Sequence, residues 1–381
     1  MFLMKKYVLN IIYLYYLYFL NFYLTLFYKK MGFLRREFLK LSILSGIVYK
    51  SFGNDNLGET GIKNGEDTSY ITIPQGLKKG SKVGITAPAS STSMGEIAGG
   101  IRFFKNIGCE VMVGDTIKKY NSSNRYFSAP DEVRAEELMQ FYEDESINCI
   151  IAARGGYGSL RILPMLDFEK IRKNPKILIG FSDISALLNA VFRKTRTICF
   201  HGPVASSNFD NFTNENLKNS IIHNKDFKKV INRVPSMSVI NEGTVQGRLV
   251  GGNLTVISST LGTEYEIETE GSILFLEEIS EHPYKIDRML TQLWLAEKLQ
   301  KASGIIFGYF HTIDSRRNFY PGYSFTIRQV IESRIKPLGI PAVLGLPIGH
   351  NSKMLMTLPI GTMAELDTKN KTLSLLEPSV C

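Results

Sequence analysis

Residues 147–194 read INCIIAARGGYGSLRILPMLDFEKIRKNPKILIGFSDISALLNAVFRK, and the order of patterns in this stretch decides the fold. Two short apolar runs, at 147–153 and 176–181, are each followed by a turn and then by a helical pattern, at 159–173 and 184–194. Short apolar strands that alternate with helices are typical of a mostly parallel sheet covered on both faces. In such sheets, functional sites form at the carboxyl ends of the strands.

The alternation of strand and helix patterns continues on the amino-terminal side of this stretch. The sequence predicts strands at 82–90 and 109–115, and helices at 97–108 and 131–144. The fold class is therefore α/β, with an N-terminal, mostly parallel, flavodoxin- or Rossmann-like sheet domain over residues 73–206.

Two polar segments divide the chain. Residues 54–72 are polar and Gly-rich and predict a linker, whereas residues 207–243 are rich in Asn and Lys and predict a crossover between domains. Residues 244–381 return to strand and helix patterns, such as the apolar run GSILFLEEI at 271–279. They predict a C-terminal α/β domain, with the active site at the junction of the two domains.

Residues 1–53 are predicted to be an export or membrane leader. About 20 uncharged, mostly apolar residues at 7–28 are enough to cross a bilayer, and the pair Arg35-Arg36 before Phe-Leu-Lys resembles a twin-arginine signal. Two alternatives stay open: translation starts at Met31, or residues 7–28 are a membrane anchor. In both cases we expect the rest of the chain in the periplasm or cell envelope, with membrane contact through the leader alone.

The charge of the chain argues against a nucleic-acid partner. The first 53 residues carry eight of the 45 Lys and Arg but one of the 36 acidic residues, so the remainder has 37 basic and 35 acidic residues. A net charge of +2 on the remainder is not a basic binding surface. The four cysteines show no C-x-x-C spacing, so no metal site is predicted.

The strand at 176–181 ends in a turn that carries Ser182. A serine between a buried strand and a helix resembles a nucleophile elbow, in which the amide of Asp183 faces an oxyanion. Ile184 occupies the last Gly position of the usual G-x-S-x-G pattern. A helix-capping role for Ser182 or Asp183 is therefore an equal alternative from the residues alone.

A serine nucleophile needs a base and an acidic group that orients the base. Of the five histidines, His201 and His350 each follow an apolar strand pattern, and their positions do not decide between them. Glu277 and Glu278 end the apolar run ILFL, where a buried carboxylate is costly without a partner.

The loop Arg154-Gly155-Gly156-Tyr157-Gly158 follows the strand at 147–153. Its glycines allow close approach of the backbone, so its amides are candidates to bind an oxyanion or a phosphate. The loop has neither the G-x-G-x-x-G spacing nor the Lys-Ser/Thr ending of nucleotide-binding motifs, which argues against a nucleotide cofactor.

Seven segments, taken together, resemble the LD-carboxypeptidase family, which comprises murein tetrapeptide carboxypeptidases and the related microcin self-immunity peptidases. The resemblance covers the chain from about Ile73 to Glu377. The segments are, in order, ITAPAS, ARGGYGSLRILPMLDF, PKILIGFSDISALLNAV, FHGP, GGNLTVISSTLGT, ILFLEEISEHPYKIDRMLTQL and GLPIGH.

The resemblance implies a Ser-Glu-His triad made of Ser182, Glu277 and His350. It thereby selects His350 over His201 as the base and Glu277 over Glu278 as the orienting group. It also implies an oxyanion hole from the amide of Asp183 and an amide of the turn formed by Gly155 and Gly156.

The implied activity is that of a serine carboxypeptidase, a protease that releases terminal D-Ala from the tetrapeptide of peptidoglycan, the murein of the cell wall. Such an exopeptidase needs a cation for the terminal carboxylate, and Arg154 and Arg248 are the candidates. The resemblance implies no metal or cofactor and suggests a homodimer. The alternative within the family is a self-immunity peptidase that cleaves a peptidyl-nucleotide amide.

Overall fold

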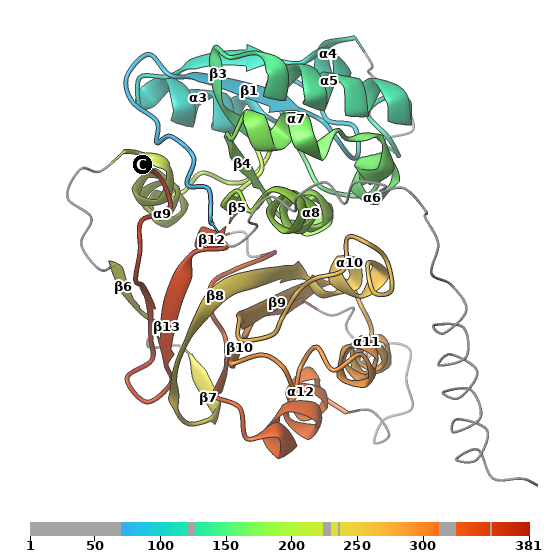
Figure 1. The fold of residues 1–381 in the computed structure, drawn as a ribbon, viewed down its shortest axis with the longest axis vertical. Helices are drawn as coiled ribbons and strands as arrows, with labels where there is room; N and C mark the ends of the chain where they lie inside the picture. The colour runs from blue at the N-terminus through green and yellow to red at the C-terminus, as the bar shows by residue number, and fades with distance from the viewer. Residues whose placement is uncertain (1–69, 120–125, 224–229, 235–236, 312–324, 351–352) are drawn as a thin grey trace, which may run out of the picture. The chain divides into compact units, whose positions relative to one another are not determined.

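A computed structural model of the chain describes residues 70–119, 126–223, 230–234, 237–311, 325–350 and 353–381. The predicted leader and most of the predicted linker lie outside these residues. The described chain forms two sheets with helices packed against them, an arrangement of two α/β domains (Figure 1). No helix within the described ranges is long and apolar enough to cross a membrane.

The first sheet has the strand order β2-β1-β3-β4-β5, with all five strands parallel, and the antiparallel strand β12 at its edge. This order is the flavodoxin-like one, in which the strand order reverses between β1 and β3. The strands are β1 (Lys82–Thr86), β2 (Glu110–Val113), β3 (Ile147–Ala152), β4 (Ile177–Gly180), β5 (Cys199–His201) and β12 (Leu358–Ile360).

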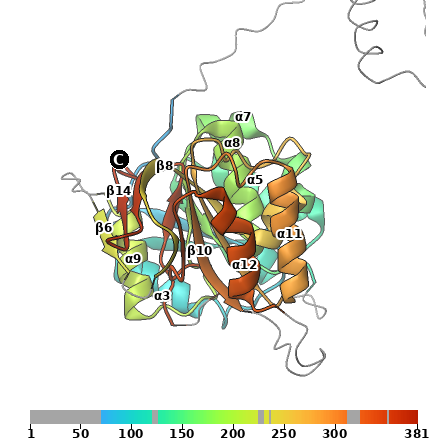
Figure 2. The same ribbon diagram turned by 90° about the horizontal axis from the view of Figure 1, so that it is seen from below.

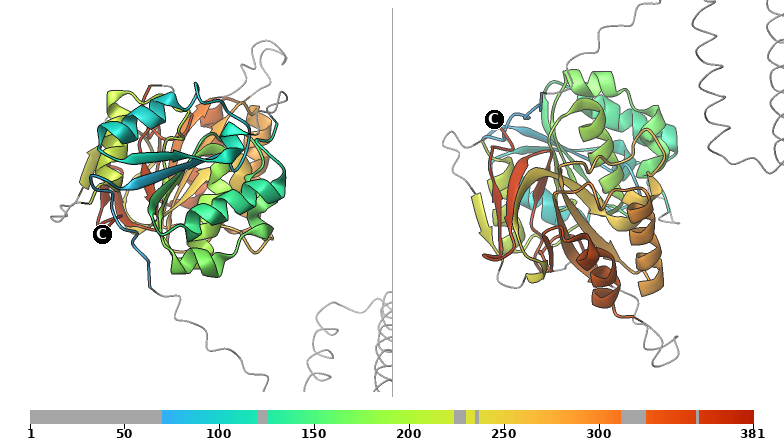
Figure 3. Two further views of the ribbon diagram at one scale, coloured as in Figure 1. Left: turned by 90° about the horizontal axis from the view of Figure 1, so that it is seen from above. Right: turned by 60° about the horizontal axis from the view of Figure 1, so that its bottom comes forward.

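Helices cover both faces of the first sheet, as the view from above shows (Figure 3). On one face, Phe104 and Leu217 pack with Ile85 and Ile179 of the sheet. The helices of this domain and of the crossover are α3 (Ala98–Asn106), α4 (Asp115–Lys118), α5 (Asp131–Glu143), α6 (Ser159–Ile162), α7 (Phe168–Lys173), α8 (Ser185–Thr195) and α9 (Asn211–Ile221).

The single helix predicted at 159–173 is wrong, because the chain forms two short helices there. Pro164 lies in a 3-10 turn, Leu163–Met165, that follows α6. Proline has no amide hydrogen to donate, so a regular helix does not run through it. The side chain of Asp167 then accepts hydrogen bonds from the amides of Glu169 and Lys170 and starts α7.

The second sheet has the order β6-β14-β13-β8-β9-β10-β11-β7, in which β8 to β11 are parallel and the outer strands are antiparallel. Helices α11 and α12 pack side by side on it (Figure 2). The elements are β6 (Val230–Arg233), β7 (Ser238–Asn241), β8 (Thr244–Asn253), α10 (Leu254–Ser259), β9 (Ile273–Ile279), α11 (Pro283–Leu295), β10 (Gly304–His311), α12 (Ile327–Ile335), β11 (Ala342–Leu344), β13 (Met363–Asp367) and β14 (Thr372–Leu375).

One continuous apolar core joins the two sheets. It includes Leu178 of β4 and Leu187 of α8 together with Phe275 of β9 and Phe307 of β10. Strand β12 of the C-terminal half pairs with β5, so the chain also returns to the first sheet. The carboxyl ends of β4 and β9 are thereby held in fixed positions relative to each other.

Arg134 of α5 is a fully buried cation that ties together the loops at the carboxyl edge of the first sheet. Its guanidinium donates to the carbonyl oxygens of Pro88, Gly158 (3.0 Å) and Ala129 (3.1 Å), and to the carboxylate of Asp131. Burial lowers the pKa of Arg134, and these acceptors offset the cost of burying the charge.

We expect the substitution Arg134→Met to lower the free energy of unfolding by about 3 kcal/mol, because it leaves buried carbonyl groups without donors. Arg161→Met is the matched control, since Arg161 pairs with the same Asp131 but has a side chain that is 49% exposed. The control is expected to cost much less than Arg134→Met, because an exposed ion pair contributes little to stability. Urea unfolding of the two variants measures both values, and equal losses would contradict the account.

Candidate active site

Ser182 lies at the tip of a sharp turn between β4 and α8. Its φ is 62°, in the left-handed region that non-glycine residues rarely adopt. A Cβ atom at Gly180 would come within 2.6 Å of Ile184, so the turn requires glycine at that position. Strained backbone at a serine after a strand is the geometry of a nucleophile elbow, even though Ile184 replaces the usual second glycine.

The structure brings Ser182, His350 and Glu277 together in a hydrogen-bonded chain. Nε2 of His350 lies 3.1 Å from Oγ of Ser182, and Nδ1 of His350 lies 2.7 Å from Oε2 of Glu277. Glu277 is fully buried, whereas the side chain of His350 keeps 17% of its surface exposed. Since a carboxylate only accepts hydrogen bonds, the proton of the neutral imidazole belongs on Nδ1, and the lone pair of Nε2 faces the serine.

Different elements supply the three side chains. Ser182 follows β4, Glu277 lies near the carboxyl end of β9, and His350 lies on a loop six residues after β11. Gly349 has a φ of 86°, and a Cβ atom there would come within 2.3 Å of Oε2 of Glu277. Glycine at 349 therefore lets the loop approach the carboxylate closely enough for His350 to bind it.

Glu278, the neighbour of Glu277, serves a different purpose. Successive side chains of a strand point to opposite faces. The carboxylate of Glu278 accepts hydrogen bonds from the side chain of Asn253, from the amide and hydroxyl of Thr255, and from the amide of Ile279. Burial raises the pKa of Glu278, and these donors oppose the rise. Glu278 therefore holds the start of α10 rather than the imidazole.

The glycine loop after β3 lies directly against the nucleophile. A Cβ atom at Gly155 would be 2.9 Å from Cβ of Ser182. The carbonyl oxygen of Gly155 accepts a hydrogen bond from the amide of Ser90 (3.2 Å), and Oγ of Ser90 accepts one from the amide of Tyr157 (3.1 Å). Because C=O and N–H point in opposite directions in a trans peptide, the amide of Gly156 points away from Ser90.

Asp183 connects the elbow to the same loop. Its buried carboxylate accepts a hydrogen bond from the amide of Ser159 at 2.8 Å, at the start of α6. The backbone amide of Asp183 lies in the first turn of a short 3-10 helix, where amides have no partner within the helix. The geometry thus keeps Asp183, Gly155 and Gly156 as candidate oxyanion donors.

Of the two candidate cations for the substrate carboxylate, the structure places Arg154 beside the site. Arg154 precedes Gly155, its side chain is 39% exposed, and its Nη1 lies 3.5 Å from Oε1 of Glu96. Asn253 of β8 is paired with Glu277 of β9. Arg248 lies five residues before Asn253 on β8, a distance of about 16 Å along the strand. Arg248 instead donates to Glu377 (2.6 Å) and to the carbonyl of Gly361, so the structure does not bring it to the triad.

His201, the alternative base from the sequence, is fully buried on β5. Its ring packs edge-on against Phe275 and Phe181, with ring centroids 5.1 and 6.2 Å apart. Burial lowers the pKa of His201 from its ordinary value of 6.5 to about 4. The ring nitrogens of this buried, neutral imidazole have no hydrogen-bond partner among the described residues, whereas Oγ of Ser182 is bonded to His350, so His201 is not the base.

The lowered pKa of His201 predicts a pH dependence of stability. Between about pH 6.5 and pH 4 the unfolded chain binds a proton at this position and the folded chain does not, so stability falls as the pH is lowered through this window. We expect the difference in unfolding free energy between about pH 7 and pH 5 to be smaller in His201→Leu than in the parent. Urea unfolding at both values checks this, and an unchanged difference would contradict it.

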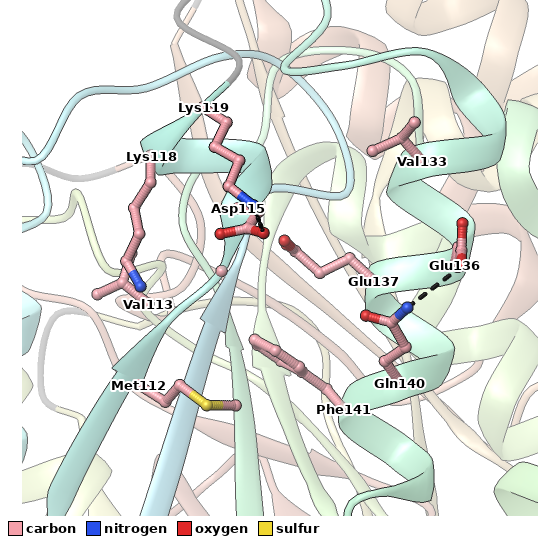
Figure 4. A pocket seen from close by; sticks show the side chains of 11 residues that line it. Met112, Val113, Asp115, Lys118, Lys119, Val133, Glu136, Glu137, Gln140 and Phe141 are labelled. Carbon is pink, nitrogen blue, oxygen red and sulfur yellow. Dashed lines mark hydrogen bonds and ion pairs between the residues drawn. The ribbon is translucent and has the colours of Figure 1, made fainter.

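A hollow of the described surface lies apart from these residues. A cavity of about 410 Å³ lies between the end of β2, α4 and α5, and Asp115, Lys118 and Glu137 line it (Figure 4). Glu137 is already bound by Thr86 and Thr116. The described residues contain no group of three or more His, Cys, Asp or Glu placed to hold a metal ion.

A serine, a histidine and a glutamate bonded in this order, with the serine and the glutamate at the carboxyl ends of strands in an α/β fold, define the class of serine hydrolases. The family models for the LD-carboxypeptidase N-terminal and C-terminal domains match residues 83–202 and 246–366. The chain belongs to the LD-carboxypeptidase family and is a hydrolase of the serine peptidase type.

Three relatives show how close the similarity is. The probable murein peptide carboxypeptidase of Bacillus subtilis is 36% identical over 305 residues, covering 78% of this chain and 92% of the relative. The crystal structure of muramoyltetrapeptide carboxypeptidase from Oxalobacter formigenes has a TM-score of 0.65 at 29% identity, covering 77% of this chain and 97% of the other. The structure of the microcin C7 self-immunity protein MccF in complex with glutamyl sulfamoyl guanosine has a TM-score of 0.72 at 25% identity, covering 81% of this chain and 99% of the other.

Sequence reasoning missed residues that position the site without taking part in it. Ser90 belongs to the segment ITAPAS, which contributed to the family resemblance but indicated no role for this serine. Its amide and its hydroxyl are both hydrogen-bonded to the glycine loop and fix the position of that loop. Arg134 lies in a strongly charged helix pattern, where nothing marked it as buried. An unusual residue cannot be recognised when its neighbours in the sequence have the same charge and polarity.

Proposed function

We propose that this protein is an LD-carboxypeptidase that hydrolyses the L,D peptide bond of the murein tetrapeptide and releases the terminal D-Ala. The observation that carries the proposal is the chain of hydrogen bonds from Ser182 through His350 to Glu277. The family and the relatives named above support the substrate class. The same chemistry applies whether the third residue of the tetrapeptide is diaminopimelate or lysine.

The proposed reaction has two steps. Nε2 of His350 takes the hydroxyl proton of Ser182 while Oγ attacks the carbonyl carbon at the L-centre, and Glu277 stabilises the imidazolium through Nδ1–H. The amides of Asp183 and of the Gly155-Gly156 turn would bind the oxyanion. His350 gives its proton to the departing amine of D-Ala. Water then attacks the acyl-enzyme with His350 as base, and His350 passes that proton to Oγ of Ser182 as the tripeptide leaves.

Arg154 is proposed to bind the carboxylate of the terminal D-Ala. It directly precedes the glycine loop that lies against Ser182, and its guanidinium is partly exposed. Its contact with Glu96 is long for a charge-assisted hydrogen bond, which leaves the guanidinium able to turn toward a substrate. A cation at this position would select for a chain end and make the enzyme an exopeptidase.

A second candidate function is cleavage of a peptidyl-nucleotide amide. It is supported by the TM-score to MccF, 0.72, which exceeds the 0.65 for the muramoyltetrapeptide carboxypeptidase. The chain is 36% identical to the probable murein peptide carboxypeptidase of Bacillus subtilis but 28% identical to MccF of Escherichia coli. This difference in identity favours the murein substrate.

The two candidates are separated by giving the purified protein both substrates. One is disaccharide tetrapeptide ending in D-Ala, in diaminopimelate and lysine forms, and the other is glutamyl sulfamoyl guanosine. We expect kcat/KM for a tetrapeptide to be higher by more than about tenfold. The reverse order would establish the second candidate, and no turnover of either by folded protein would overturn both.

We also propose that the protein acts in the cell envelope. The proposal is supported by the apolar run at 7–28 and by Arg35-Arg36, both outside the described residues. Fractionation of cells that produce the full chain tests it, with activity expected in the envelope fraction. Activity confined to the cytoplasm would overturn it. The homodimer stays a prediction of the family resemblance.

A further inference from the structure

In the described part of the chain, one buried side chain of the triad and one beside it have polar atoms that lack partners. Glu277 and His201 have no exposed surface. Across the residues that the structure describes, Oε1 of Glu277 and both ring nitrogens of His201 have no hydrogen-bond partner. Buried polar atoms are almost always paired with protein or with ordered water, because leaving one unpaired is costly.

The two side chains are neighbours in the core. The ring of His201 packs against that of Phe275, 5.1 Å away, and Phe275 lies two residues before Glu277 on β9. Side chains two residues apart on a strand lie on the same face, about 7 Å from each other. His201 therefore lies over the same face of β9 as the carboxylate of Glu277.

Two further contacts place His201 at the back of the triad. The ring of Phe181 contacts the imidazoles of both His201 and His350, with centroids 6.2 and 4.9 Å apart. A Cβ atom at Gly252 would lie 3.7 Å from Cδ2 of His201. Gly252 pairs with Leu276, directly before Glu277, so His201 lies close to β8 at the level along the strands where Glu277 follows on β9.

The protonation state of His201 suits a carboxylate neighbour. With its pKa lowered to about 4, the imidazole is neutral at neutral pH and has one N–H donor. The titratable groups that act on it are Glu277 from β9 and His350 from the loop after β11. Asp183 on the elbow is occupied by the amide of Ser159. Oε1 of Glu277 is thus the acceptor that an N–H of His201 would serve.

We propose that His201 is a positioning residue that donates through one ordered water molecule to Oε1 of Glu277. The carboxylate is then held from two sides, which fixes Oε2 for the Nδ1–H of His350. A water bonded to both unpaired groups would have two polar partners, within the range of about two to four that buried waters make. The inference rests on the proposed function, because the orientation of Glu277 matters for turnover only if Ser182 and His350 perform the reaction.

The kinetic test compares His201→Leu, which cannot donate, with His201→Gln and His201→Asn, whose amides can. Loss of the donor is expected to lower kcat for D-Ala release about tenfold in the Leu variant, with little change in KM. It should also move the acid limb of the pH profile of kcat/KM upward, because the unpaired carboxylate attracts the imidazole proton more strongly. At least one amide variant should keep the parent profile.

Two results would overturn the positioning role. One is a Leu variant with the kcat and the pH profile of the parent. The other is an equal loss in the Leu, Gln and Asn variants with an unmoved profile, which would show that the ring serves only to fill space.

A second measurement does not depend on any substrate. In protein labelled with 15N-histidine, the Nδ1 proton of His350 that bonds to Glu277 should give a low-field NMR signal, and this signal should move in His201→Leu but stay in place in an amide variant. If the parent cleaves no murein peptide, the proposed function fails while this signal still tests the contact. An identical signal in the parent and in the Leu variant would overturn the inference.

Discussion

Replacing Ser182 with alanine is expected to lower kcat for D-Ala release by about 10⁴-fold or more, because the reaction then has no nucleophile. The substitution removes one oxygen atom from a partly exposed position and leaves the turn at Gly180 intact. We therefore expect the unfolding free energy to change by less than about 1 kcal/mol. Steady-state release of D-Ala and urea unfolding measure the two quantities.

Measuring binding beside turnover in Ser182→Ala separates an enzyme from a protein that only binds cell-wall peptides. Titration calorimetry should show that Ser182→Ala binds the tetrapeptide about as tightly as the parent does before the parent has cleaved it. Ser259→Ala, an exposed serine at the end of α10, is the control and should leave kcat unchanged. Parent-like turnover by Ser182→Ala would exclude Ser182 as the nucleophile.

The second large effect is expected for Glu277→Gln. Glutamine has the same shape, but its amide nitrogen can face Nδ1 of His350, and the imidazole would then carry its proton on Nε2, toward Ser182. That tautomer cannot accept the serine proton, so kcat should fall by about 10³- to 10⁴-fold with KM nearly unchanged. Steady-state kinetics at several pH values measure this loss.

Glu278→Gln is the matched control, since the adjacent carboxylate is equally buried but faces Asn253 and Thr255. Loss of its charge-assisted hydrogen bonds should lower the unfolding free energy by about 1–3 kcal/mol and change kcat by less than tenfold. If Glu278→Gln removed activity and Glu277→Gln did not, the proposed roles of the two glutamates would be exchanged.

Much of the architecture could be predicted from the sequence, because the signals are local. The β-then-α order of residues 82–194 predicted a parallel sheet, and the structure has the strand order β2-β1-β3-β4-β5. The strained turn at Ser182 could be predicted because a buried strand, a glycine and a helix follow one another within a few residues.

The candidate site could be predicted only in part, because it is made of contacts distant in the sequence. From the residues alone, His201 and His350 were equal candidates, and only the structure shows that one is buried among Phe181 and Phe275 while the other bonds to Ser182. The pairing of β8 with β9 likewise places Arg248 away from the site, which no local pattern could reveal.

The most direct test of the proposed function is product analysis with the purified parent protein on two tetrapeptides that differ only in the chirality of the last alanine. We predict that the D-Ala peptide yields free D-Ala and tripeptide in equal amounts, and that the L-Ala peptide is not cleaved. Folded protein that releases no D-Ala, or that cuts an internal bond of the peptide instead, would contradict the assignment of an LD-carboxypeptidase.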